Sequence, residues 1–238
     1  MTSSNITGRI HSLQSLGTVD GPGIRFVIFM QGCNLRCGYC HNPDTWKTDE
    51  GTLCSPEELI SKIVRYKSYF GKEGGVTVSG GEPLLQAEFV TELFKLCHFE
   101  GINTCLDTSG SIMNSKIAEL IKHTDRVLLD IKFTNDDDYK KYVGCSINAP
   151  LSFLDYLNEE GIPVTLRQVI VPELNSSKES IIRLKDIIIS HPCVDKTELL
   201  PFKKICKVKY DNMGIEFPFD KYSTPNSELI SGLNKHLN

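Results

Sequence analysis

Short apolar runs alternate with segments of helical periodicity along most of this chain. The apolar runs are nearly continuous, as in strands that are buried on both faces of a sheet. They lie at 24–32, 75–80, 102–110, 126–132, 163–171 and 197–202. Helical periodicity occupies 55–70, 86–101, 114–124, 149–161 and 176–191, and more weakly 136–144. The alternation predicts an α/β fold with parallel strands, either a β/α barrel or an open doubly wound sheet, and among these we favour a partial (β/α)6, TIM-like barrel.

Two helix boundaries are marked by capping residues. Ser55, Pro56 and Glu58 predict an N-cap, a first helical position and a capping box, and Gly101 predicts a C-terminal stop. No stretch resembles a domain linker. We therefore expect one domain over 1–238, with a core at about 8–202, an N-terminal extension at 1–23 and a C-terminal segment at 203–238.

Composition and charge exclude several classes of protein. The chain has 26 basic and 30 acidic residues, a net charge of −4, which disfavours non-specific binding to nucleic acid or to an anionic membrane. No apolar run approaches the roughly 20 residues that a membrane-spanning helix needs. The first residues lack the basic start and apolar core of an export signal. We expect a soluble cytoplasmic protein.

The nine cysteines are distributed unevenly. An odd number in a cytoplasmic protein argues against a disulfide framework. Six are isolated and are typical of small core residues. These are Cys54, Cys97, Cys105, Cys145, Cys193 and Cys206. Only Cys33, Cys37 and Cys40 cluster, in CNLRCGYCHN.

Four kinds of site compete for that cluster. Covalent haem would use the C-x-x-C-H pattern, and a redox pair would use C-x-x-C, but both leave Cys33 without a role. Structural zinc needs a fourth ligand, and His41 directly follows Cys40, which would strain the site. An iron–sulfur cluster needs several thiolates from one short loop. Three cysteines on four irons would leave one iron open to a substrate or cofactor.

Polar motifs follow the carboxyl ends of the predicted strands, where barrel enzymes place their sites. The cysteine loop follows the first strand, and Gly80-Gly81-Glu82-Pro83 follows the second. Asp107 ends the third, and Asp130 with Lys132 ends the fourth. Because Lys132 comes two residues after Asp130, both side chains should lie on the same side of the strand.

The spacing C-x3-C-x2-C resembles the radical S-adenosylmethionine (SAM) superfamily. Together with TVDGPGIR, YCHNPDTW, SGGEP, CLDTSG, LLDIK and ELLPF, it resembles the activases of glycyl-radical enzymes, from Gly8 to about Phe202. The resemblance implies an anaerobic oxidoreductase with a [4Fe-4S] cluster whose open iron binds SAM. Reductive cleavage would give methionine and a 5′-deoxyadenosyl radical, which removes a hydrogen from one glycine of a partner enzyme. The radical is carried by the cofactor, so no side chain is assigned as an acid or base.

The resemblance also assigns roles to individual residues. Cys33, Cys37 and Cys40 would bind the cluster. The residues that would contact SAM are Tyr39, Cys40, His41, Gly81, Glu82, Asp130, Ile131, Lys132 and Lys203, the last standing where such activases usually have histidine. Asp107 and Asp130 would hold a monovalent cation, and Asp20 and Arg167 would contact the partner's peptide.

The expected partner follows from what the chain leaves out. Cys54 is the only cysteine in residues 41–79, so this range holds no ferredoxin-like insert with extra cysteine pairs. This favours the type of activase whose partner is pyruvate formate-lyase, with flavodoxin or ferredoxin as reductant and a monomeric chain. Three alternatives stay open: an activase of another glycyl-radical enzyme such as anaerobic ribonucleotide reductase, a small-molecule radical SAM enzyme, and an electron-transfer iron–sulfur or zinc-binding protein.

Overall fold

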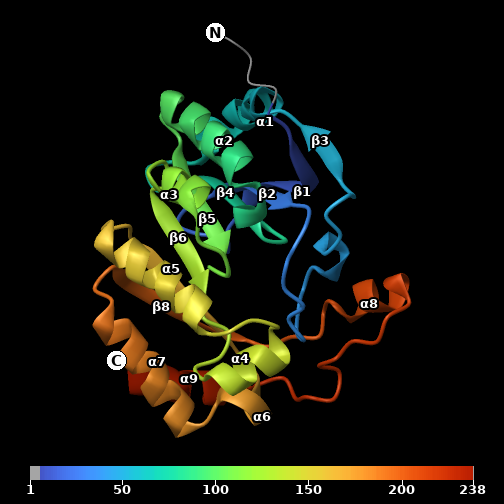
Figure 1. The fold of residues 1–238 in the computed structure, drawn as a ribbon, viewed down its shortest axis with the longest axis vertical. Helices are drawn as coiled ribbons and strands as arrows, with labels where there is room; N and C mark the ends of the chain where they lie inside the picture. The colour runs from blue at the N-terminus through green and yellow to red at the C-terminus, as the bar shows by residue number, and fades with distance from the viewer. Residues whose placement is uncertain (1–5, 238) are drawn as a thin grey trace. The chain divides into compact units, whose positions relative to one another are not determined.

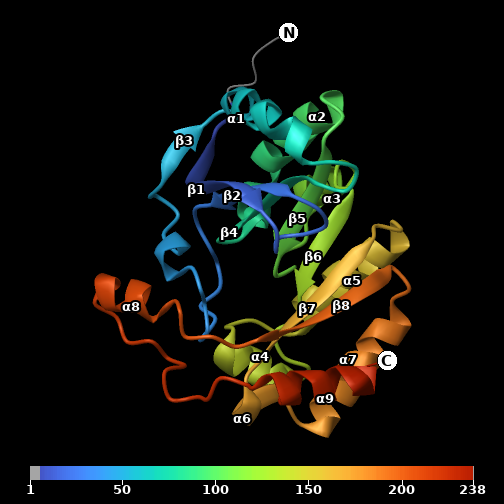
Figure 2. The same cartoon turned by 180° about the vertical axis from the view of Figure 1, so that it is seen from behind.

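The fold is a mixed α/β arrangement around an open sheet, and the computed structural model describes residues 6–237. The strands are β1 (Gly8–Gly17), β2 (Arg25–Met30), β3 (Thr52–Cys54), β4 (Gly75–Gly80), β5 (Asn103–Thr108), β6 (Arg126–Asp130), β7 (Val164–Ile170) and β8 (Val194–Pro201). Hydrogen bonds join them in the order β3-β1-β2-β4-β5-β6-β7-β8 (Figures 1 and 2).

Most strand pairs are parallel, which confirms the predicted fold class. Strand β2 pairs with β4, β4 with β5, and β7 with β8, each in the parallel sense. Strand β1 is antiparallel to both β2 and β3. Strands β1 and β3 were not predicted. The sequence of β1 alternates small, polar and apolar residues instead of forming an apolar run.

The chain forms two compact units. One holds the chain up to Asn34 together with Thr45–Leu128, and the other holds Leu35–Asp44 and the chain from Leu129. The boundary falls within β6. The single domain expected from the sequence stays a prediction.

The first unit is a sheet with helices on one face. Its α-helices are α1 (Pro56–Ile63), α2 (Ala87–Phe99) and α3 (Ser115–Ile121), and its 3₁₀ segments are η2 (Val64–Tyr69) and η3 (Pro83–Gln86). Helices α2 and α3 lie against one face of β4 and β5 (Figures 1 and 2). Strands β2 and β4 are buried along nearly their whole length, as their continuous apolar runs predicted.

The predicted helix boundaries of this unit are confirmed. The Ser55 hydroxyl accepts a hydrogen bond from the backbone N–H of Glu58 at 3.2 Å, and the Glu58 carboxylate accepts one from the N–H of Ser55 at 2.8 Å. Gly101 follows α2 with a φ of +65°, a backbone conformation that favours glycine. Both ends are set by local chemistry.

The second unit surrounds an aromatic core. Its α-helices are α4 (Asp136–Tyr142), α5 (Asn148–Glu159), α6 (Pro172–Asn175), α7 (Lys178–Ser190), α8 (Lys207–Met213) and α9 (Ser227–Leu237), and the 3₁₀ segment η1 (Pro43–Thr45) reaches its edge. Phe133, Phe153 and Phe202 are fully buried. Within residues 6–237, no helix has both the length and the apolar character to cross a membrane.

Candidate active site

The cysteine loop is closed at its base by backbone hydrogen bonds within the first unit. The N–H of Gly32 donates to the carbonyl of Thr45 at 2.7 Å, and the N–H of Cys33 donates to the carbonyl of Trp46 at 3.3 Å. The chain therefore leaves β2 and returns at nearly the same place. Residues 34–44 therefore form a loop whose two ends lie close together.

The turn after β4 crosses the end of β2 at very short range. Gly81 donates from its N–H to the carbonyl of Met30 at 2.9 Å, and Glu82 donates from its N–H to the carbonyl of Gly32 at 2.8 Å. A Cβ added at Gly81 would lie 2.1 Å from the oxygen of Gly32. Gly80 also has a φ of +109°. This close approach requires glycine.

The Glu82 carboxylate is buried and fully engaged by its own chain. One oxygen accepts from the Thr108 hydroxyl at 2.6 Å and from the N–H of Leu84 at 3.1 Å. The other accepts from the N–H of Ser109 at 3.0 Å and from the Ser109 hydroxyl. A carboxylate offers about four lone-pair sites, so these four donors occupy all of them. Glu82 thus fixes the segment that follows β5, and its contact with SAM stays a prediction.

The end of β5 and the segment after it are fixed at two further points. The Ser79 hydroxyl donates to Asp107 at 2.7 Å, and the Asn34 amide donates to the Ser111 hydroxyl at 3.1 Å. Asn34 directly follows Cys33. The end of β4, the segment after β5 and the start of the cysteine loop are therefore joined within one unit.

The rest of the cysteine loop packs against the end of α4 in the second unit. The N–H of Arg36 donates to the carbonyl of Val143 at 3.3 Å, and that of Gly38 donates to the carbonyl of Tyr142 at 2.8 Å. A Cβ at Gly38 would lie 2.1 Å from the ring of Phe219. Cys37 is held between two anchored residues.

Residues of the C-terminal segment hold the far end of this loop. The Tyr210 hydroxyl donates to the carbonyl of Cys40 at 3.1 Å, and His41 donates from Nε2 to the carbonyl of Lys203 at 3.0 Å. Burial lowers the pKa of His41. Lys203 meets His41 through its backbone, and its own ammonium group is exposed. The segment after residue 202 is therefore part of the site's framework.

Tyr39 has a buried hydroxyl without a hydrogen-bond partner among the described residues. Its ring packs against Phe133 and Phe219, with centroid separations of 6.2 and 5.5 Å. The Lys132 ammonium group lies 5.8 Å from its ring centroid. Burial raises the pKa of Tyr39 well above its ordinary value. An unpartnered buried hydroxyl costs free energy, so it favours a bound polar group at this position.

Beside Tyr39, Asp130 lies between two cations. Its carboxylate is 3.1 Å from the Lys132 ammonium and 2.9 Å from Nε of Arg167. Burial alone would raise the pKa of Asp130, but the two positive charges and their hydrogen bonds hold it below its ordinary value. Burial alone would likewise lower the pKa of Lys132, and Asp130 raises it well above the ordinary value. The two side chains meet as predicted, although β6 ends at Asp130 and Lys132 lies two residues beyond the strand.

The Asp130 ion pairs bear on two other expectations. Arg167 directs its guanidinium at Asp130 and is buried, whereas we expected it to contact a partner peptide. A monovalent cation at Asp130 would have to displace Lys132 or Arg167, because a third positive charge there is unfavourable. Both expectations stay predictions.

The donor chemistry of the loop fits an iron–sulfur cluster. Burial raises the pKa of the Cys37 thiol to about 12, and the nearby Lys132 charge opposes that rise. A coordinated metal deprotonates a thiol by supplying positive charge directly. Cys33 belongs to the first unit and Cys37 and Cys40 to the second, and within residues 6–237 no three Cys, His, Asp or Glu side chains are grouped as ligands of one metal ion. The cluster assignment depends on ligand type and spacing.

The remaining predicted residues lie at different places. Ile131 is buried, and its backbone pairs with Arg167 of β7 at 3.0 Å. Asp20 lies in the turn between β1 and β2, where its carbonyl accepts a hydrogen bond from the Thr77 hydroxyl of β4 at 2.6 Å. The predicted site residues are therefore joined in two groups, one in each unit, and Asp20 is bonded to β4 of the first unit.

Sequence reasoning missed the hydroxyl groups that fix the acids of the first unit. Ser79 and Ser109 were not singled out, although each donates to an acid that was. A signal was present in β4, where Thr77 and Ser79 interrupt a buried apolar strand at alternate positions. Polar residues two apart on a buried strand face the same side, which indicates a polar layer there.

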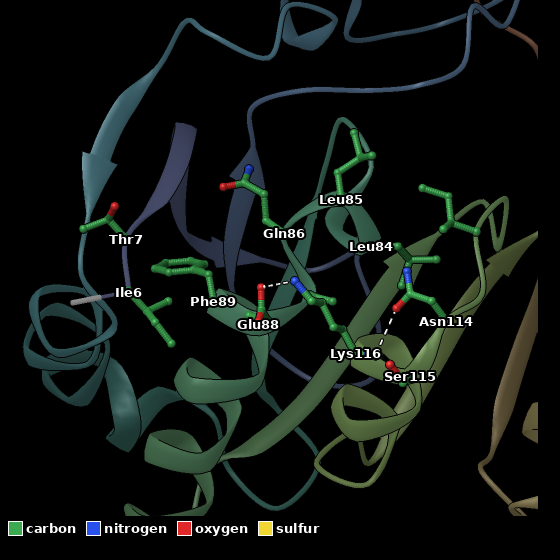
Figure 3. Close-up of a pocket in the computed structure, with 12 residues that line it drawn as sticks. Ile6, Thr7, Leu84, Leu85, Gln86, Glu88, Phe89, Asn114, Ser115 and Lys116 are labelled. Atoms are coloured by element: carbon green, nitrogen blue, oxygen red, sulfur yellow. Dashed lines mark hydrogen bonds and ion pairs between the residues drawn. The ribbon is translucent and has the colours of Figure 1, made fainter. Parts of the chain in front are cut away.

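A separate pocket of about 790 Å³ lies in the first unit, between η3, the start of α2 and the start of α3 (Figure 3). Glu88 and Lys116 point toward one another across it and form an ion pair of 2.7 Å. Asn114, which also lines it, caps α3 through its side chain. The Gln86 amide, which also lines it, donates to the carbonyls of Arg9 and Gln31, and no predicted site residue lines the pocket.

Comparison with known proteins identifies the family. The sequence matches the radical SAM superfamily over residues 27–184. It is 46% identical to the pyruvate formate-lyase-activating enzyme of Clostridium pasteurianum over 233 residues, 98% of each chain. It is 44% identical to the pyruvate formate-lyase 1-activating enzyme of Escherichia coli strain K12 over 229 residues, 95% of this chain and 93% of that protein.

This chain belongs to the radical SAM superfamily, among the pyruvate formate-lyase-activating enzymes. Membership in a radical SAM family implies a [4Fe-4S] cluster and SAM as cofactors, in agreement with the thiol donors of the loop. Solved structures agree on the fold. A radical SAM methyltransferase from Sphaerobacter thermophilus superimposes with a TM-score of 0.67 at 16% identity, over 97% of this chain and 74% of that one.

Proposed function

We propose that this protein activates pyruvate formate-lyase by generating a glycyl radical on it under anaerobic conditions. The proposal is carried by the similarity to pyruvate formate-lyase-activating enzymes, which extends over 98% of both chains in the relative from C. pasteurianum. In this proposal the cluster supplies an electron for reductive cleavage of SAM to methionine and a 5′-deoxyadenosyl radical, which takes a hydrogen from a glycine of the partner.

In this proposal the residues of the cysteine loop have two tasks. Cys33, Cys37 and Cys40 hold the cluster and leave one iron for SAM. Tyr39 and His41 contact SAM from the same loop. The unpartnered Tyr39 hydroxyl and the anchored backbone of the loop support these tasks, because they offer a polar group in a fixed, water-poor position.

Charged residues at the end of β6 and just after it would then orient SAM. Lys132 would meet its carboxylate and Asp130 its ribose hydroxyls, with Arg167 keeping Asp130 ionised and in place. Gly81 would offer backbone groups, Glu82 would hold the neighbouring segment, and Lys203 and Ile131 would lie along the cofactor. The finer assignments are a monovalent cation near Asp107 and Asp130, a flavodoxin or ferredoxin as reductant, and a monomer in the cytoplasm.

The test is radical formation on the partner. The anaerobically reconstituted, reduced protein is mixed with SAM and pyruvate formate-lyase, and the mixture is followed by electron paramagnetic resonance (EPR). We expect a glycyl radical signal that requires all three components and is lost when the partner's radical glycine is replaced by alanine. A signal obtained only with anaerobic ribonucleotide reductase would move the function to that partner. No radical on either enzyme would overturn the proposal.

A further inference from the structure

A fully buried cation lies outside the site described above. Arg25, at the start of β2, is 0% exposed. Its guanidinium donates to the Thr77 hydroxyl at 3.0 Å, to the Asn103 side-chain oxygen at 2.8 Å and to the Glu73 carbonyl at 3.1 Å. These acceptors are all uncharged oxygens. Burying a charge among neutral groups costs free energy unless its donors are hydrogen-bonded. These bonds therefore hold the Arg25 side chain in one position, and we call Arg25 with its acceptors the Arg25 hub.

The hub fixes the turn Asp20-Gly21-Pro22-Gly23. The Thr77 hydroxyl accepts from Arg25 and donates to the carbonyl of Asp20 at 2.6 Å. The Arg25 guanidinium also donates to the carbonyl of Pro22 at 3.4 Å. Two carbonyls of the turn are thereby held by Arg25, that of Pro22 directly and that of Asp20 through Thr77.

Glycine is required where the turn touches the sheet. Gly23 has a φ of +67°, and a Cβ there would lie 2.5 Å from the backbone nitrogen of Gly74. Gly21 has a φ of +125° and lies over Cys105 of β5, with 3.4 Å between its ideal Cβ and that sulfur. The turn therefore lies directly on one face of β4 and β5. Meanwhile Val19, next to Asp20, is 78% exposed.

That face also carries an acid of the candidate site. Thr77 and Ser79 are two residues apart on β4, so their side chains share a face, and Ser79 donates to Asp107. Two residues of a strand span about 6.6 Å. Thr77, which holds the Asp20 carbonyl, is therefore only one two-residue repeat of β4 away from Ser79, which bonds Asp107.

We propose that Thr77 is a positioning residue which, held by Arg25, fixes the Asp20–Gly23 turn as a pre-shaped contact for the partner's glycine-bearing segment. This inference rests on the proposed function. A turn that is already ordered loses little freedom when the partner binds, so the relay lowers the entropic cost of association. Loss of the Thr77 hydroxyl frees the turn and weakens partner binding, while the chemistry of the bound complex is preserved.

The experiment compares Thr77→Val with two matched variants. Valine keeps the shape of threonine without its hydroxyl, Thr77→Ser keeps the hydroxyl, and Thr91→Val removes a buried hydroxyl that bonds only the Ala87 carbonyl of its own helix, at 2.7 Å. Hydrogen exchange of the amides in 18–24 and the KM and kcat for pyruvate formate-lyase are measured. We expect Thr77→Val to speed that exchange and to raise KM about tenfold with kcat within about twofold, a change typical of one lost hydrogen bond. Thr77→Ser and Thr91→Val should behave as wild type.

A second measurement needs only the wild-type protein. Binding of pyruvate formate-lyase should slow exchange of the amides in 18–24. The inference is overturned if wild type forms the glycyl radical while its turn exchanges equally fast with and without the partner, or if Thr77→Val changes neither exchange nor KM. Absence of any glycyl radical with wild type would instead count against the proposed function.

Discussion

At the scale of single residues, two carboxylates of the candidate site are held by opposite kinds of partner. Glu82 is surrounded by hydroxyl and backbone donors, whereas Asp130 lies between the charges of Lys132 and Arg167. Glu82 is therefore an anchor for the backbone after β5. Asp130 instead neutralises two buried positive charges, so we expect its contribution to stability to depend on pH.

Asp130→Asn should destabilise the protein at neutral pH by about 3 kcal/mol, because Lys132 and Arg167 would be left buried without their counter-ion. The folded pKa of Asp130 lies below its ordinary value of 3.8. Its contribution to stability is therefore complete above that value, and it is lost as the pH falls through the lower folded pKa. We expect the difference between wild type and variant to shrink below about pH 4, measured as the free energy of unfolding in urea from pH 7 to pH 3.

The control is Asp211→Asn, which removes an exposed carboxylate from α8 and should change the free energy of unfolding by less than about 0.5 kcal/mol at any of these pH values. An Asp130→Asn variant as stable as wild type at pH 7 would show that the ion pairs contribute nothing. A difference that grew toward acid would contradict the depressed pKa.

The sequence predicted part of this charge cluster. Asp130 and Lys132 could be paired because they are two residues apart in sequence, although the strand itself ends at Asp130. Arg167 could not be added, because it lies 37 residues from Asp130 and meets it only through the tertiary fold. For the same reason the hydroxyl groups of Thr108 and Ser109 could not be assigned to Glu82 in advance.

At the scale of elements, signals that act over a few residues were sufficient where they were present. The capping box at Ser55 and Glu58 and the stop at Gly101 were predicted and are confirmed. Strand β1 was missed because four of its ten residues are exposed and it has no apolar run. Helix α8 was missed because its lysines are typical of a solvated surface, yet its Tyr210 is buried and bonds the cysteine loop.

The capping box gives a prediction for α1. Ser55→Ala should lower the free energy of unfolding by about 1 kcal/mol, since the N–H of Glu58 then loses its acceptor at the helix start. Ser61→Ala is the matched control in the same helix, because the Ser61 hydroxyl bonds only the carbonyl of Glu58 and caps no helix end. Urea unfolding monitored by circular dichroism measures both. Equal effects of the two substitutions would contradict the assignment of the cap.

At the scale of the whole molecule, the three predicted cluster ligands lie in one loop whose residues are divided between the two compact units. Cys33 lies in the first unit and Cys37 and Cys40 in the second, while backbone hydrogen bonds hold the loop within each unit. The open, mostly parallel sheet followed from the alternation of apolar runs and helical segments. The anchoring of the loop by α4 and by the C-terminal segment could not be predicted, because those contacts join residues far apart in the sequence.

The central proposal is that these three cysteines hold the [4Fe-4S] cluster and leave one iron open to SAM. It is tested by EPR of the anaerobically reconstituted, dithionite-reduced protein, recorded with and without SAM. Alanine variants of Cys33, Cys37 and Cys40 are compared with Cys193→Ala, which alters a half-exposed cysteine outside the loop. We expect a reduced [4Fe-4S] signal that changes on addition of SAM, is unaffected in Cys193→Ala and is lost in each of the other three variants. A cluster signal indifferent to SAM, a protein that binds zinc and no iron, or a SAM-responsive signal retained in any of the three loop variants would contradict it.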